Sequence, residues 1–152
     1  MSNPNIKAQL LAQCNDYVNK RIANSKQAMD DAQAAANEES KSSAGDKYET
    51  GRAMAQIERD NAAQQLEEAL KLKNILSGLD SSIVNDSVRL GSVVETTGSN
   101  FYIAISTGKF LIEGKEYLIV SPNSPIGKLL LNLKVGDIFR FNSKEEVVKH
   151  VI

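Results

Sequence analysis

Residues 11–36 read LAQCNDYVNKRIANSKQAMDDAQAAA, and apolar or small residues recur along this stretch at steps of three and four. The recurring positions are Leu11, Cys14, Val18, Ile22, Ser25, Met29, Ala32 and Ala36. A stripe this narrow is typical of a coiled-coil seam, whereas a helix that covers a globular core has a broader apolar face. The stretch predicts one long helix, from about Asn5 to Ser42 and roughly 55 Å in length.

A second stripe follows on residues 54–79 and consists of Met54, Ile57, Ala62, Leu66, Ala69 or Leu70, Leu76 and Leu79. In an antiparallel hairpin, the numbers of facing residues add up to a constant. The two stripes pair Ile22 with Leu66, Val18 with Leu70, Leu11 with Leu76 and Met29 with Ile57, with sums of 86 to 88. The fold-back therefore centres near residue 44, where Ser42-Ser43-Ala44-Gly45 supplies turn residues. Because the seam thins from Leu, Val and Ile to Ala and Ser toward this point, we expect a slender hairpin with a projecting tip.

The composition changes near residue 78. From Gly78 onward the chain holds seven of its nine Gly, two of its three Pro and six of its eight aromatic residues, a profile of short strands and turns. Strand candidates are Ser92–Thr96, Asn100–Ser106, Phe110–Ile112, Lys115–Val120, Asp137–Phe141 and Glu146–Val151. Ser124 is a favourable N-cap with Pro125 at the first helical position, so one short helix should follow. We predict an α+β fold, with an antiparallel helical hairpin over residues 1–79 and a small antiparallel-sheet domain with one short helix over residues 88–152.

Charge and composition exclude several classes of protein. With 18 Lys and Arg against 19 Asp and Glu, the chain is neither a polyelectrolyte nor a nucleic-acid-coating protein, and we expect no binding to free DNA. No continuous apolar run marks a signal peptide or a membrane span, and the single Cys14 cannot form an internal disulfide. These features favour a cytoplasmic protein without a membrane partner.

The predicted tip carries the sequence GDKYET at residues 45–50. If the second helix starts here, Asp46 and Glu49 lie three residues apart on one face of its first turn. Two such carboxylates can share a divalent cation, but Mg²⁺ takes six oxygen ligands, so the others must come from water or another macromolecule. The alternative is purely structural, since Asp-x-x-Glu also has the form of a capping box.

Two segments resemble the bacterial GreA/GreB transcript cleavage factors. SPIGKLLL at residues 124–131, followed by VGD at 135–137, resembles that family's C-terminal signature, which reads approximately SPIAxALxGKxxGD. The tip matches the family's GDxxEN at Gly45, Asp46 and Glu49, and with the hairpin the resemblance spans essentially the whole chain. It implies an FKBP-like C-terminal domain that docks on RNA polymerase, with Ser124, Pro125, Ile126 and Gly127 as the docking signature, and a hairpin that enters the secondary channel.

The resemblance also implies a chemistry for the tip. Asp46 and Glu49 would complete the coordination of a Mg²⁺ ion held jointly with the polymerase and so stimulate its cleavage of backtracked transcripts. The protein would then be a cofactor of the polymerase rather than an enzyme, would hold no metal alone, and would meet the nascent RNA 3′ end only indirectly. Lys41, Lys47, Tyr48 and Arg52 would lie near that RNA, although charges scattered over a solvated helix are the more usual arrangement.

The chain departs from the family at several positions. Thr50 replaces the usual Asn, Arg52-Ala53 stand where Glu-Tyr is usual, and Ser42 replaces a basic residue. Two alternatives therefore stay open: a channel-binding regulator that does not stimulate cleavage, and a protein-interaction module in which the coiled coil dimerises. The polymerase-binding hypothesis predicts a monomer.

Overall fold

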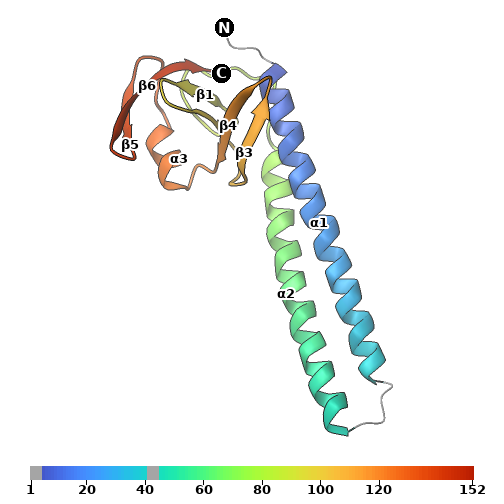
Figure 1. The fold of residues 1–152 in the computed structure, drawn as a ribbon. Coiled ribbons are helices and arrows are strands. Elements are labelled where there is room, and N and C mark those ends of the chain that lie inside the picture. The colour runs from blue at the N-terminus through green and yellow to red at the C-terminus, as the bar shows by residue number, and fades with distance from the viewer. Residues whose placement is uncertain (1–4, 41–44) are drawn as a thin grey trace. The chain divides into compact units, whose positions relative to one another are not determined.

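The computed structural model describes residues 5–40 and 45–152, with side chains for residues 5–38 and 49–152. The elements are α1 (Asn5–Ser40), α2 (Gly45–Ser77), β1 (Val93–Thr96), β2 (Asn100–Ile103), β3 (Gly108–Ile112), β4 (Lys115–Val120), α3 (Pro125–Leu130), β5 (Ile138–Phe141) and β6 (Lys144–Val151). Figure 1 shows the two long helices side by side and antiparallel, followed by the sheet and its short helix. The predicted α+β class, with a helical hairpin and a sheet carrying one short helix, is confirmed.

The chain forms two compact units. One is the shaft of the hairpin, Tyr17–Lys73; the other combines the chain up to Asp16 with Asn74–Ile152, that is, the start of α1, the end of α2 and the whole sheet. Among the described helices, none combines the length and apolar character that a membrane crossing requires.

The hairpin seam is built mainly from small residues. On α1, Val18, Ser25, Ala32 and Ala36 are buried at the predicted positions, and Ile22 and Met29 are partly buried. On α2, the buried residues of the shaft are Ala55, Ala62 and Ala69, which recur every seven residues as in a coiled coil. The seam is therefore thin, as predicted.

Several seam predictions on the second helix are wrong. Met54 and Ile57 are each 59% exposed and Leu70 is 48% exposed, whereas Ala55 and Ala69 are buried beside them. The pairings of Met29 with Ile57 and Val18 with Leu70 therefore fail. The predicted Ala62 is buried, and so is Ala69, which was the alternative to Leu70. The stripe is wrong at Met54 and Ile57, because two closely packed helices place small side chains between them and leave larger neighbours outside.

Near the start of α1, the predicted seam residue Leu11 is only partly buried. The neighbouring Leu10 is fully buried together with Ile6 and Cys14. These residues belong to the same compact unit as the sheet, so this end of α1 contributes to a globular core and needs a broader apolar face than a two-helix seam.

The sheet has six strands in the order β3-β4-β2-β1-β6-β5. All six predicted strands are present within a few residues of their expected bounds. Four neighbouring pairs are antiparallel, but β2 and β4 pair in parallel, with Phe101 beside Leu118 and Ile103 beside Val120. The sheet is thus mixed rather than purely antiparallel, because the β3–β4 hairpin joins the sheet through β4. β4 pairs with β2 in parallel, and β3 forms the edge of the sheet. Short strand signals do not specify which strands become neighbours.

One face of the sheet packs against α3. The core on this face contains Val88, Val94, Phe101, Ile103, Ile126, Leu130, Phe139 and Val148. Two of these, Ile126 and Leu130, come from α3 and lie four residues apart on one side of the helix, so the short helix is held by the face that its apolar spacing predicts.

Candidate functional site

The first candidate site is the hairpin tip, where α2 begins at Gly45. Asp46 and Glu49 are the second and fifth residues of this helix, so they occupy its first turn with the three-residue spacing that the sequence indicated. The alternative role of Asp46 as a cap concerns a side chain that lies outside the described residues, so both interpretations of Asp46 and Glu49 stay predictions.

Part of the predicted tip lies outside what the structure describes. Lys41 and Ser42 fall in the segment 41–44, and the side chains of Asp46, Lys47 and Tyr48 are likewise outside the described set. Glu49 and Arg52 are described, and both are exposed.

Glu49 borders a shallow depression on the first turns of α2. Its described lining consists of Glu49, Arg52, Ala53 and Gln56, and its volume is about 360 Å³. Glu49 and Arg52 are three residues apart, so an acidic and a basic side chain share one wall. A cation placed here would meet the negative charge of Glu49 and the positive charge of Arg52 together.

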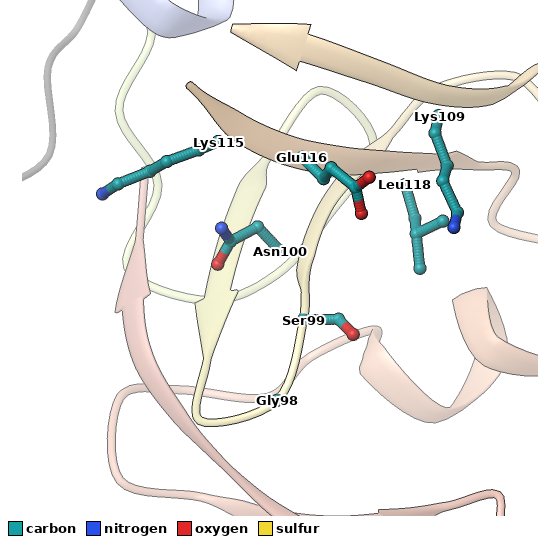
Figure 2. Close-up of a pocket in the computed structure, with 7 residues that line it drawn as sticks. All are labelled: Gly98, Ser99, Asn100, Lys109, Lys115, Glu116 and Leu118. Carbon is teal, nitrogen blue, oxygen red and sulfur yellow. The ribbon is translucent and has the colours of Figure 1, made fainter. Parts of the chain in front are cut away.

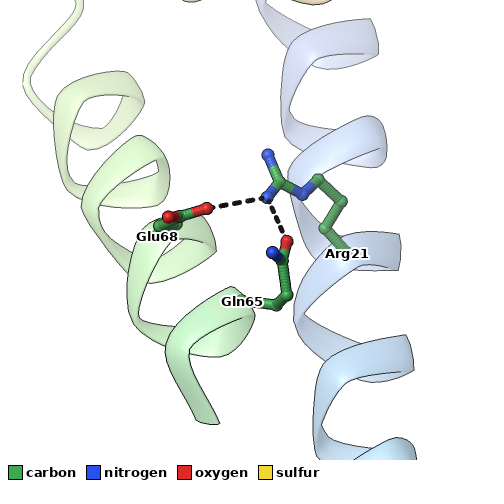
Figure 3. Close-up of polar contacts among 3 residues, drawn as sticks. All are labelled: Arg21, Gln65 and Glu68. Carbon is green, nitrogen blue, oxygen red and sulfur yellow. Dashed lines mark hydrogen bonds and ion pairs between the residues drawn. The ribbon is translucent and has the colours of Figure 1, made fainter. Parts of the chain in front are cut away.

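Near the end of the shaft that is remote from the tip, Arg21 links the two helices (Figure 3). Its Nη2 donates a hydrogen bond to Gln65 Oε1 at 3.3 Å and lies 3.8 Å from Glu68 Oε2. The guanidinium carbon also lies 6.0 Å from the centre of the Tyr17 ring, at the outer limit of a cation–π contact. These contacts fix the register of α1 against α2 at one level, which the small seam residues alone specify weakly.

The second candidate site is the segment Ser124–Gly127 at the start of α3. Ser124 is the N-cap, as predicted: its hydroxyl accepts a hydrogen bond from Gly127 N at 3.0 Å and donates one to the Ser121 carbonyl oxygen at 2.7 Å. Pro125 occupies the first turn, where its missing N–H costs nothing.

Gly127 is required by a close approach of the backbone. A Cβ at this position would lie 2.0 Å from the Ser121 carbonyl oxygen and 2.9 Å from Ser124 Oγ. The glycine thus lets the loop before α3 fold tightly onto the helix.

These contacts give the signature residues a structural role. Ile126 and Gly127 are buried and face the core, so a partner cannot touch them directly. Pro125 and Leu129 are exposed on α3, Leu129 by 45% of its surface. Any docking through this segment would use the exposed side of α3, which the buried signature residues position.

A second depression lies at the start of β2 and β4 (Figure 2). It has a volume of about 440 Å³ and is lined by Gly98, Ser99, Asn100, Lys109, Lys115, Glu116 and Leu118. Lys115 points away from Lys109 and Glu116, so the charged groups do not converge on one point. None of the residues predicted for function lines it.

Buried polar groups lie outside all predicted sites. Lys7, at the start of α1, is only 2% exposed, and burial lowers the pKa of its ammonium group. Its place one helical turn before Leu10 and Leu11 was the available signal, since it continues the apolar stripe backward. Burial raises the pKa of Cys14 to about 12, so this thiol has no thiolate character near neutral pH and behaves as a small core residue, as predicted.

Three further buried atoms, Glu95 Oε1, Thr107 Oγ1 and Tyr117 Oη, have no hydrogen-bond partner among the described residues. Within the described side chains, no three His, Cys, Asp or Glu residues gather in a metal-binding arrangement. No protein-family model and no curated protein matches the chain.

Proposed function

We propose that this protein is a transcription elongation factor that binds RNA polymerase, inserts its helical hairpin into the secondary channel and stimulates cleavage of backtracked transcripts. The observation that carries the proposal is the position of an acidic pair, Asp46 and Glu49, in the first turn of α2, directly after the fold-back of a long and thin hairpin. A shaft whose buried residues are mostly Ala and Ser gains little stability from its length. Its length is better explained by a need to place the tip inside another molecule.

The proposed chemistry requires both partners. The polymerase holds one Mg²⁺ firmly and a second weakly, and Asp46 and Glu49 would supply oxygen ligands for the second ion. By holding that ion, Asp46 and Glu49 would help to orient the water that attacks the RNA backbone, and the metal would supply the activation of that water. The protein acts as a cofactor in this scheme, because two carboxylates alone leave most of the coordination positions unfilled.

The signature on α3 supports the docking half of the proposal. The resemblance to the GreA/GreB family assigns docking to this segment, and its exposed residues, Pro125, Lys128 and Leu129, are the ones available to a partner. We propose that the exposed side of α3 contacts the polymerase near the channel entrance, in an FKBP-like domain of a cytoplasmic protein.

A second candidate function is favoured by Arg52. Its place beside Glu49 in the tip depression puts a positive charge where a metal ion would have to bind. This arrangement favours a regulator that occupies the channel and leaves cleavage unstimulated or suppressed. Both functions share the same docking and differ only at the tip.

One experiment separates the candidates. A stalled, backtracked elongation complex is incubated with Mg²⁺ and the protein, and the RNA is followed from its 5′ end. Cleavage stimulation predicts that the wild type shortens the transcript and that Asp46→Asn with Glu49→Gln binds but leaves the RNA intact. The matched control, Asp30→Asn with Glu58→Gln, removes the same charge from exposed positions on the shaft and should cleave as the wild type does.

Other outcomes decide against cleavage stimulation. A wild type that binds and slows intrinsic cleavage identifies the regulator. A tip double variant as active as the wild type refutes the proposed role of the two carboxylates.

Docking is tested separately by pull-down with core RNA polymerase. Leu129→Asp should weaken retention, whereas Leu111→Asp, which alters a 64% exposed residue on edge strand β3, should not. Equal retention of both variants refutes docking through α3. The absence of any retention refutes the polymerase partnership and favours the interaction module.

A further inference from the structure

A small cavity lies between the start of α1 and the connection from α2 to β1, within the unit that contains the sheet. Its volume is about 190 Å³. The lining residues are Lys7, Gly78, Leu79, Asp80, Ile83, Asn85, Arg89, Leu90 and Gly91. None of them belongs to the hairpin tip or to α3, so the proposed polymerase function leaves this cavity without a role.

Lys7 is the unusual member of the lining. Its side chain is almost fully buried, and its Nζ donates a hydrogen bond to the carbonyl oxygen of Ile83. An ammonium group has three N–H donors. Among the described residues, Lys7 Nζ has one hydrogen-bond partner, the neutral carbonyl oxygen of Ile83. A buried charge is costly unless it is paired, so the cavity contains a cation with unused capacity.

Asp80 compensates this charge incompletely. It lies near enough to act electrostatically on Lys7, but its Oδ1 accepts hydrogen bonds from the Ser82 backbone N at 2.9 Å and from the Ser82 hydroxyl at 2.6 Å. With Arg89 also on the wall, the lining carries two positive charges against one negative charge. The cavity is therefore suited to a ligand with a single negative charge.

The backbone around the cavity is held in place. Ser92 Oγ accepts hydrogen bonds from Asn85 Nδ2 at 3.1 Å and from Arg89 N at 3.0 Å, and Gly91 N donates to the Ile103 carbonyl oxygen at 2.7 Å. A binding site whose walls are already fixed loses little entropy when it is occupied.

The remaining walls are apolar. Leu79, Ile83 and Leu90 line the cavity, and Ile83 and Leu90 are 54% and 43% exposed without a ligand. A cavity of roughly 150 Å³ is enough for a molecule the size of benzene, so this one accepts about six to eight non-hydrogen atoms. We infer that it binds a small apolar monocarboxylate, with the carboxylate on Lys7 Nζ and the hydrocarbon tail against these three side chains.

Such a carboxylate has two sources, a free metabolite or the C-terminal residue of a partner protein with an apolar side chain. The probes are isovalerate for the free acid and N-acetyl-leucine for a chain terminus. Isovaleramide, which has the same shape without the charge, is the control ligand.

The test is a titration of the full-length protein followed by backbone amide NMR. Isovalerate or N-acetyl-leucine should produce saturable shifts in residues 78–91 with a Kd on the order of millimolar, as expected for so few atoms. Isovaleramide should bind at least about tenfold more weakly, the loss of roughly one charge-assisted hydrogen bond. Tighter binding of N-acetyl-leucine identifies a chain terminus as the source, and tighter binding of isovalerate identifies a free acid.

Variants assign the effect to Lys7. Lys7→Met keeps the length and apolar stem of the side chain and should weaken binding at least about tenfold, since it removes the charged partner. Arg89→Gln, at an exposed position that should not disturb folding, should weaken it several-fold, and Lys128→Met, at an exposed lysine of α3, should not change it. The inference is overturned if no saturable shift appears in residues 78–91, if isovaleramide binds as well as isovalerate, or if Lys7→Met binds like the wild type. None of these results depends on the polymerase.

Discussion

Substitution of Gly127 by alanine tests how the signature segment is built. In an ordinary helix the change stabilises by up to about 1 kcal/mol, because alanine is the better helix former. Here the new Cβ would lie 2.0 Å from the Ser121 carbonyl oxygen, whereas an ordinary contact begins at 3.4 Å. The oxygen must therefore retreat by more than an ångström.

That retreat breaks the local hydrogen bonds. The Ser121 oxygen accepts from Ser124 N at 3.1 Å and from Ser124 Oγ at 2.7 Å, each worth about 1 kcal/mol net. Overpacking adds about 1 to 3 kcal/mol, and the gain in helix propensity offsets about 1. We expect Gly127→Ala to lower the free energy of unfolding by about 2 to 4 kcal/mol and the Tm by roughly 10 to 30 °C.

The assay is urea unfolding followed by near-UV circular dichroism of tyrosine. Two of the four tyrosines, Tyr102 and Tyr117, are buried in the unit that contains the sheet, so the signal reports on that unit. Gly78→Ala is the matched control, because its Cβ would meet only Ile75 O at an ordinary 3.6 Å. The reasoning is refuted if Gly127→Ala unfolds within about 0.5 kcal/mol of the wild type, the usual range for harmless surface changes.

Three other predictions follow from buried or bridging side chains. Cys14, fully buried and with its pKa raised to about 12, should react with a thiol reagent at pH 8 only as the protein unfolds; labelling of the native protein within seconds contradicts this. Arg21→Met should lower the free energy of unfolding of the hairpin by less than about 1 kcal/mol, with a smaller difference in high salt, because Arg21 and Glu68 are partly exposed. At pH 7, the Tm of Lys7→Met should equal or exceed that of the wild type. As the pH rises toward 10.5, the stability of the wild type should increase relative to that of the variant. The reason is that burial lowers the pKa of Lys7, so the unfolded chain binds more protons in that window; a difference that widens with pH contradicts it.

The sequence was a good guide to the elements and a poorer guide to their partners. The spacing of apolar residues at steps of three and four, together with the turn residues, located both long helices. Short stretches rich in Val and aromatic residues between glycine turns located the six strands. Both signals are local in the sequence. The seam of α2 was misplaced at Met54 and Ile57, where the buried residue is Ala55, and of the two alternatives at the next turns, Ala69 and Leu70, the smaller residue is the buried one. The parallel pairing of β2 with β4 depends on contacts between segments distant in sequence, which no local pattern encodes.

The candidate sites show the same division. Ser124 and Pro125 could be placed at a helix start from residue type alone, and the structure confirms it. The burial of Ile126 and Gly127 could not be predicted from residue type, because it depends on how α3 lies against the sheet and against Ser121. Lys7 was missed because a lysine is expected at a surface, and only its spacing from Leu10 and Cys14 hinted otherwise.

The composition of the hairpin also explains why its tip is a clean place to test function. Among the described side chains of the shaft, the buried ones nearest the tip are Ala36, Ala32 and Ala55, which are all small. Exposed charges away from such buried side chains change stability by about 0.5 kcal/mol or less. Asp46→Asn with Glu49→Gln should accordingly leave the unfolding of the protein unchanged, while Gly127→Ala destabilises it without altering the tip. A loss of RNA cleavage confined to the tip variant would then report on chemistry at the tip, since stability and chemistry depend on different residues.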